Sequence, residues 1–283
     1  MKKQQLLLWL VVSLSLVRLT NALERFDAVY GSGLNKLVVA TASPGELGLL
    51  KAIAEAFAKE HNATICWRKA GSGKSLQLLR SREVDAVMVH APQAEKKALR
   101  EGWATQRTLI GCNEFFIVGP AHDPAGVSTA KTAPEAYRRI ASTCSRFFSR
   151  GDNSGTHKKE MLIWKTAKII PKGKWYVTTG DFMRATLRRA NAEKGYFMTD
   201  SSTWIAERKH LANLKLLFKG DAMLVNVYHG LCQPRGATAG AAIASKFLGF
   251  LASSEAQQIL RAYGKSQFGE GLYRDAQYAR QYE

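Results

Sequence analysis

Three short segments combine glycines, hydroxyl side chains and, in one case, an arginine at points where an expected strand is followed by an expected helix. They are residues 40–46 (Ala-Thr-Ala-Ser-Pro-Gly-Glu), residues 70–75 (Ala-Gly-Ser-Gly-Lys-Ser) and residues 149–157 (Ser-Arg-Gly-Asp-Asn-Ser-Gly-Thr-His). Backbone N–H groups are unpaired at the start of a helix, so hydroxyls and a guanidinium beside them form a set of donors that suits an anion. The three segments therefore predict an anion-binding site.

Two of these segments also have a purely structural interpretation. Ser43 and Glu46 have the spacing of a capping box, with Pro44 at the first helical position. In the third segment, Asp152 can pair with Arg150 while Ser154 caps the following helix. Both interpretations stay open at the level of sequence.

The motifs of common enzymes are absent from the chain. Residues 70–75 end like a phosphate-binding P-loop, but position 68 holds an arginine where that motif requires glycine. There is no Gly-x-Ser-x-Gly elbow and no His-Glu-x-x-His pair, and no neighbouring residue is a base for Ser154. The sequence therefore predicts a protein without catalytic residues and without a nucleotide cofactor.

The net charge favours anionic partners but does not identify them. Forty-one Lys and Arg residues against 23 Asp and Glu residues give +18. The basic residues are scattered along the chain, which argues against nucleic acid as the partner. Cys66, Cys112, Cys144 and Cys232 lack the paired spacing of a metal site, so no metal site is predicted, and disulfides and buried thiols both stay open.

The first 22 residues have the pattern of an export signal. Lys2 and Lys3 precede an apolar run over residues 6–16, and Thr-Asn-Ala at 20–22 forms a small-residue cleavage site. The run is shorter than the ~20 residues of a membrane span. We expect cleavage after Ala22 and a mature protein outside the cytoplasm.

Apolar strands then alternate with helical patterns. Strands are expected over 37–40, 63–67 and 85–89 and helices over 46–61, 74–80 and 92–102, followed by a strand at 114–119 and a second α/β set from 134 to about 219. This order predicts two α/β lobes joined by two crossings, with a cleft between them. We expect one lobe from 36–113 with about 228–273, the other from about 114–227, and a tail at 274–283.

In several segments the chain resembles the tungstate-binding periplasmic proteins, which are the receptor components of ABC importers for that oxyanion. The similar segments are residues 40–43, 71–73, 84–87 with 90–92, 113–120 and 149–160. The last is nearly complete over 12 residues, and the similarity runs from about Lys36 to Tyr273.

The resemblance implies a two-lobed periplasmic binding-protein fold of type II that holds tungstate or molybdate in its cleft. It also implies a periplasmic monomer that has a membrane permease as partner, binds no nucleic acid and needs no cofactor. The residues that the resemblance assigns to the oxyanion are Thr41, Ser43, Ser72, Gly73, Arg150, Ser154 and Thr156.

Some positions depart from the family pattern. Ala40 and Ala42 replace threonines, and Ser72 stands where threonine is usual. Phe182 and Arg184 stand where the family has small residues. The lost hydroxyls predict weaker binding or a changed selectivity, and Arg184 either adds a cation near the cleft or covers its rim.

The nearest alternative is a receptor for phosphate, because phosphate-binding proteins share the Arg-x-Asp-x-Ser-Gly-Thr pattern of the third segment. Phosphate retains protons at neutral pH and favours a carboxylate acceptor, and Asp152 keeps that alternative open. A secreted hydrolase and a basic nucleic-acid-binding protein are more remote alternatives.

Overall fold

The computed structural model describes residues 26–283, so the export signal expected over residues 1–22 lies outside the described residues. Within residues 26–283, eleven strands form one sheet in the order β1-β3-β2-β4-β10-β5-β8-β6-β7, with β9 and β11 paired to β5. The strands are β1 (Ala28–Tyr30), β2 (Asn35–Thr41), β3 (Ala63–Lys69), β4 (Ala86–Val89), β5 (Thr105–Pro120), β6 (Phe147–Ser149), β7 (Tyr176–Thr178), β8 (Tyr196–Asp200), β9 (Leu214–Phe218), β10 (Val225–Cys232) and β11 (Arg274–Asp275).

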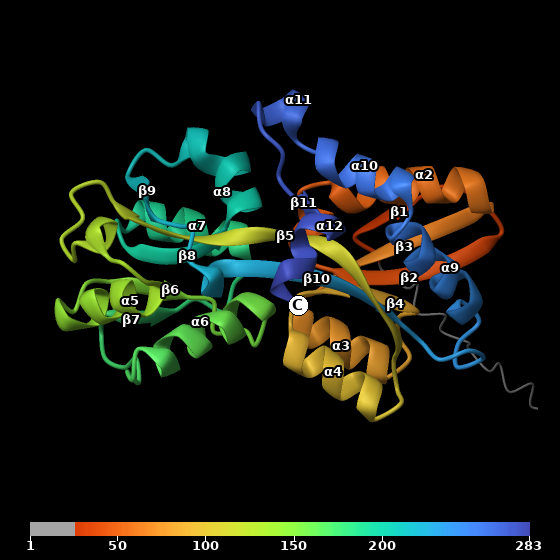
Figure 1. The fold of residues 1–283 in the computed structure, drawn as a ribbon, viewed down its shortest axis with the longest axis horizontal. Helices are drawn as coiled ribbons and strands as arrows, with labels where there is room; N and C mark the ends of the chain where they lie inside the picture. Colours follow the sequence, from red (N-terminus) through yellow and green to blue (C-terminus); the bar gives the residue numbers. More distant parts are fainter. Residues whose placement is uncertain (1–25) are drawn as a thin grey trace, which may run out of the picture.

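Helices cover both faces of this sheet (Figure 1). They are α1 (Ser43–Glu46), α2 (Leu49–His61), α3 (Ser72–Arg80), α4 (Pro92–Arg100), α5 (Ala133–Ser142), α6 (Gly155–Thr166), α7 (Met183–Ala192), α8 (Ser201–Glu207), α9 (Ala241–Leu251), α10 (Ser254–Ala262), α11 (Lys265–Phe268) and α12 (Ala276–Ala279). No helix of this part of the chain has the length and apolar content that a membrane crossing requires.

The sheet has two halves, each with a parallel centre. In the first half β3, β2 and β4 run parallel, and in the second half β8, β6 and β7 do. The long strand β5 connects the halves: its residues up to Glu114 pair with β10, and its residues from Phe115 on pair with β8. Figure 1 shows β5 and β10 running side by side through the middle of the molecule. The two-lobed α/β fold is therefore confirmed.

The continuous apolar strands of the first half are buried on both faces. Leu37 and Val39 of β2 belong to one core with α2 and α9, and the alternate residues Val38 and Ala40 belong to another core with α3 and α4. Because successive side chains of a strand point to opposite faces, a strand between two helical layers must be apolar at every position.

The last ten residues, expected as a tail, are part of the fold. Strand β11 pairs antiparallel with β5, with Arg274 opposite Cys112 and Asp275 opposite Gly111. Helix α12 follows, and Figure 1 shows it over the centre of the molecule, where the halves are joined. The C-terminal segment thus packs on the connection between the halves.

Candidate functional site

The second and third segments meet where the two halves of the molecule contact each other. Gly71 precedes α3, and a Cβ atom built on it would lie 3.1 Å from Cβ of Ser154 and 3.7 Å from Nη2 of Arg150. A Cβ atom on Gly73 would lie 2.4 Å from the carbonyl oxygen of Asn153. The glycines of the second segment therefore allow the starts of α3 and α6 to approach closely.

The first segment reaches the second half through Ser43. Its hydroxyl donates to Oδ2 of Asp200, at the end of β8, over 3.3 Å. The expected capping box is wrong: Ala42 is the N-cap of α1, and Glu46 pairs with Nζ of Lys69 at 2.6 Å. Ser43 is therefore used between the halves and not within its own helix.

Thr41 and Ser72 differ in what their hydroxyls do. Thr41 is fully buried and donates to the carbonyl oxygen of Met88 at 2.9 Å, which links β2 to β4. The Ser72 hydroxyl accepts the N–H of His90 at 3.2 Å, so its own proton can be donated elsewhere. Of these two hydroxyls, only that of Ser72 has a proton to donate without losing a present bond.

Arg150 and Ser154 take part in the structural arrangement that the sequence left open. Nη2 of Arg150 donates to Oδ2 of Asp152 at 2.5 Å, and Oδ1 of Asp152 accepts the N–H of Ser154 at 3.1 Å. Ser154 is the N-cap of α6 and accepts the N–H of His157 at 3.3 Å. This interpretation is confirmed, yet it leaves part of the donor set unused.

The unused donors are Nε of Arg150 and Oγ1 of Thr156. Both atoms are buried without a hydrogen-bond partner, in side chains that are 2% and 1% exposed. Buried polar atoms in native proteins are almost always paired, and an unpaired one costs about 1–3 kcal/mol. Two such donors among the predicted site residues indicate that a ligand with acceptor atoms completes the site.

Burial is the largest influence on the pKa of each titratable group around these donors, and the Arg150 guanidinium adds to it at His90 and opposes it at Asp152 and Asp200. Burial, followed by the Arg150 guanidinium, lowers the pKa of His90 to about 3, so its imidazole is neutral. Burial alone would raise the pKa of Asp152, but Arg150 and the hydrogen bonds from Ser154 bring it below its ordinary value. Burial raises the pKa of Asp200 against the hydrogen bonds from Thr203.

Four polar residues of this region lie outside the predicted set of site residues. Asp200 and His90 lie against the site itself: Ser43 bonds Asp200, and a Cβ on Gly155 would lie 2.4 Å from the His90 ring. Asn113 of β5 and Asn226 of β10 lie on the two strands that join the halves. Only His90 and Asn113 fall in segments that carried the family resemblance, and no local pattern marks the other two.

Arg184 does not add an unpaired cation to the site. Its Nε lies 2.9 Å from Oε1 of Glu207, whose other carboxylate oxygen is 2.8 Å from Nε of Arg188. Glu207 is buried, and it pairs with both guanidinium groups. The Arg184 departure is accounted for by this ion pair.

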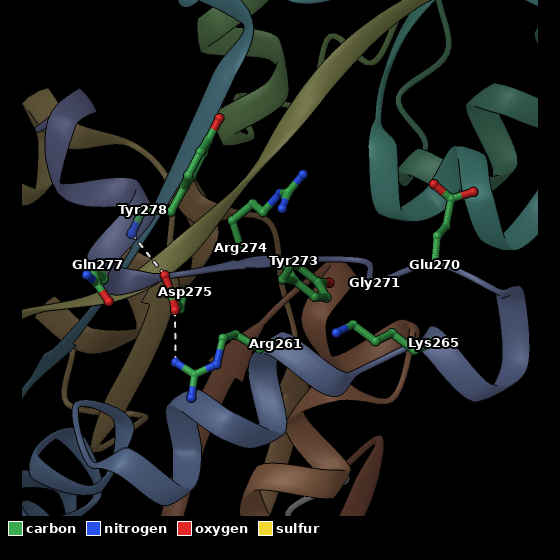
Figure 2. A pocket seen from close by; sticks show the side chains of 9 residues that line it. All are labelled: Arg261, Lys265, Glu270, Gly271, Tyr273, Arg274, Asp275, Gln277 and Tyr278. Atoms are coloured by element: carbon green, nitrogen blue, oxygen red, sulfur yellow. Dashed lines mark hydrogen bonds and ion pairs between the residues drawn. The ribbon is translucent and has the colours of Figure 1, made fainter.

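A separate hollow lies on the C-terminal segment (Figure 2). It measures about 580 Å³, and none of the seven predicted site residues lines it. Its guanidinium and carboxylate groups include the ion pair of Arg261 with Asp275, 2.9 Å apart. The charges that line this hollow therefore partly neutralise each other, whereas the buried donors Nε of Arg150 and Oγ1 of Thr156 are unpaired.

No group of three or more His, Cys, Asp or Glu side chains within residues 26–283 is placed to hold a metal ion. Cys66, Cys112 and Cys232 are buried and Cys144 is exposed, and none of them forms a disulfide within the described residues.

Comparison with known proteins places the chain among binding proteins. The model of the PBP superfamily domain matches residues 28–255. The tungstate-binding protein TupA of Peptoclostridium acidaminophilum is 30% identical over 243 residues, which cover 84% of this chain and 84% of that protein.

Two solved structures are similar over nearly their whole length. One is the tungstate ABC transporter protein of Geobacter sulfurreducens, with 34% identity, a TM-score of 0.74 and coverage of 82% of this chain and 100% of that one. The other is the tungstate-binding protein TupA of Desulfovibrio alaskensis G20, with 36% identity, a TM-score of 0.70 and coverage of 85% and 98%.

Proposed function

The chain belongs to the PBP superfamily and to the family of the tungstate-binding proteins, and from this premise we propose that it captures tungstate for import through an ABC transporter. The observation that carries the proposal is the pair of buried donors without partners, Nε of Arg150 and Oγ1 of Thr156. A tetrahedral oxyanion placed against them supplies the acceptors that both atoms lack.

The proposed ligand residues differ in whether their donor protons are already used in hydrogen bonds within the protein. Arg150, Thr156 and Ser72 have protons to donate in the present arrangement, and the backbone N–H of Gly73 lies at the start of α3. Ser154 accepts a hydrogen bond as the cap of α6 and keeps its own proton. Thr41 and Ser43 complete the set, and they would have to leave Met88 and Asp200 to reach the anion.

The charge of the anion is balanced by more than one group. Arg150 is the cation of the third segment, and part of its charge is offset by Asp152. The starts of α3 and α6 add the positive ends of two helix dipoles, each equivalent to about half an elementary charge. Hydrogen bonds to a charged acceptor contribute about 1.5–3 kcal/mol each, so a few of them suffice for tight binding.

The carboxylates of the site favour a fully deprotonated anion over hydrogen phosphate. Oδ2 of Asp152 accepts from Arg150, and Oδ1 accepts from Ser154, so both oxygens are already used. Asp200 likewise accepts from Thr203 and Ser43. The carboxylates of the site are thus engaged by protein donors, and tungstate and molybdate accept hydrogen bonds without donating any.

The remaining features of the proposal follow from the family. We expect a binding protein that breaks no bond, uses no cofactor and acts as a monomer in the periplasm. Its partner would be the membrane permease of an ABC importer.

A thermal-shift panel tests the proposal. Because a ligand that binds only the folded protein stabilises it by mass action, tungstate should raise Tm strongly and molybdate comparably or less. Sulfate and phosphate should change Tm little. A panel in which phosphate is the strongest stabiliser would favour the phosphate alternative, and one in which no anion raises Tm would overturn the assignment.

A further inference from the structure

The ring of Phe182 contacts a cation from each half of the molecule. Phe182 is the N-cap residue of α7, in the second half. Nζ of Lys69, at the end of β3 in the first half, lies 4.2 Å from the centre of its ring. Cζ of Arg150, in the second half, lies 5.6 Å from the same centre.

These distances have two physical consequences. An aromatic face attracts a cation by about 0.5–2 kcal/mol, more when water is excluded. The ring also helps to bury the Arg150 guanidinium, which is 2% exposed, and charges interact more strongly where water is excluded. Phe182 therefore affects both the position of Arg150 and the strength of its attraction for an anion.

The contact with Lys69 acts between the halves. If the halves separate, the ring and the ammonium group separate with them, so the contact favours the arrangement in which the starts of α3 and α6 meet. Lys69 is held in place by Glu46, 2.6 Å away. Arg184, two residues after Phe182, is paired with Glu207, so this stretch contributes an aromatic ring and not a charge to the site.

We propose that Phe182 is a positioning residue that slows release of the bound oxyanion, by holding Arg150 and by contacting Lys69 across the junction of the halves. The inference rests on the proposed function. It goes beyond that function because it assigns retention of the ligand to a side chain outside the predicted donor set.

The test compares three substitutions of Phe182 by calorimetric titration and by the rate of tungstate release. Phe182→Ala should raise the Kd for tungstate about tenfold, mainly through faster release. Phe182→Tyr keeps the aromatic face and should stay within about threefold of wild type, and Phe182→Leu should lie between the two. Ile170→Ala, at a side chain that is 85% exposed, is the control.

Coupling to Lys69 gives an independent measurement. Phe182→Leu and Lys69→Met remove the two sides of the contact, so the double variant should lose less affinity than the product of the single losses. Strictly multiplicative losses would overturn the contact between the halves. The melting temperature without ligand, measured for every variant, separates retention from a loss of folding.

The measurements distinguish a wrong inference about Phe182 from a wrong proposed function. If wild type binds tungstate and Phe182→Ala releases it as slowly as Ile170→Ala does, the inference about Phe182 is wrong and the proposed function stands. If wild type does not bind tungstate, the proposed function itself is wrong.

Discussion

The hydroxyl of Ser43 donates to Oδ2 of Asp200 over 3.3 Å, and this bond joins the first predicted ligand segment to the opposite half of the molecule. Asp200 also caps α8, where it accepts the N–H of Thr203 at 2.8 Å. A residue expected to hold a ligand is thus already part of the contact between the halves.

The same contact continues to the strands that connect the halves. Nδ2 of Asn113 donates to Oγ of Ser202 at 2.8 Å, and Nδ2 of Asn226 donates to Oδ1 of Asn113 at 2.8 Å. Ser202 in turn donates to the carbonyl oxygen of Leu272 in the C-terminal segment. Any rearrangement of the halves must therefore be accommodated by this buried polar chain.

Thr156→Val should separate ligand binding from folding. The Thr156 hydroxyl has no partner, so its loss should leave the free energy of unfolding without ligand within about 1 kcal/mol of wild type. The Kd for tungstate should rise about 10- to 100-fold. Urea unfolding and calorimetric titration measure the two quantities.

Thr41→Val is the matched comparison, because the Thr41 hydroxyl is bonded to Met88. It should lower the free energy of unfolding by about 1 kcal/mol or more, since the buried Met88 carbonyl loses this hydrogen bond. Equal effects of the two valines on folding would show that the Thr156 hydroxyl has a structural partner.

Arg150 should be required for tungstate binding, and lysine at this position should not restore the affinity. Arg150→Ala removes the guanidinium and should weaken tungstate binding by at least ~2 kcal/mol. Arg150→Lys keeps a charge, but one ammonium group does not reproduce the fixed fork that pairs with Asp152 and presents Nε at the same time. We expect the lysine variant to stay at least about tenfold weaker than wild type in the same titration. Full recovery by lysine would mean that only net charge matters there.

Gly73→Ala should hinder the close approach of the halves. The added Cβ would lie 2.4 Å from the carbonyl oxygen of Asn153, too close without a shift of backbone. We expect at least about a tenfold loss of tungstate affinity. This loss should occur although alanine favours helix formation over glycine by up to about 1 kcal/mol. Gly249→Ala in α9 is the control, since nothing lies within 4 Å of its added Cβ. Equal affinities of the two variants would show that the observed approach is not needed for binding.

How far the sequence predicts this structure depends on how local the determining contacts are. The run of apolar residues in β2 and the 3.6-residue period of α2 are enough to predict those elements. Burial on one or both faces requires apolar residues at a regular spacing, which is visible in the sequence. Ser149–Glu160 likewise marked the third segment, where the cap and the Arg150–Asp152 pair are contacts between near neighbours.

The errors came from contacts between residues far apart in the chain. Ser43 and Glu46 have the spacing of a capping box, but their actual partners are Asp200 and Lys69. The strand β11 was expected as a tail because only its pairing with β5 makes it a strand. The seven ligand residues stay a prediction, because their types are visible in the sequence whereas the availability of each donor depends on the three-dimensional neighbours.

Glu160 should make stability depend on pH near neutrality. It is 1% exposed, and burial raises its pKa to about 7 from the ordinary 4.5, against hydrogen bonds from Tyr176 and Trp164. Because the folded protein then binds the proton more tightly than the unfolded chain does, the free energy of unfolding should fall as pH rises from about 4.5 to about 7. The change contributed by this group is about 3 kcal/mol.

Glu160→Gln should remove that fall, while Glu255→Gln, at an exposed position, should keep it. Asp200 contributes a fall of the same sign, so the quantity to measure by urea unfolding is the difference between wild type and Glu160→Gln across the pH range. Parallel pH profiles of the two proteins would show that Glu160 titrates normally.

The most direct test of the account is a crystal structure of the protein with tungstate, using diffraction data collected at the tungsten L-III edge. We expect one strong anomalous peak between the halves, with Nε of Arg150 and Oγ1 of Thr156 within hydrogen-bonding distance of the oxyanion. A peak in the hollow beside Lys265 and Arg274 (Figure 2) instead, or a fully loaded protein with those two donors still unpaired, would contradict it.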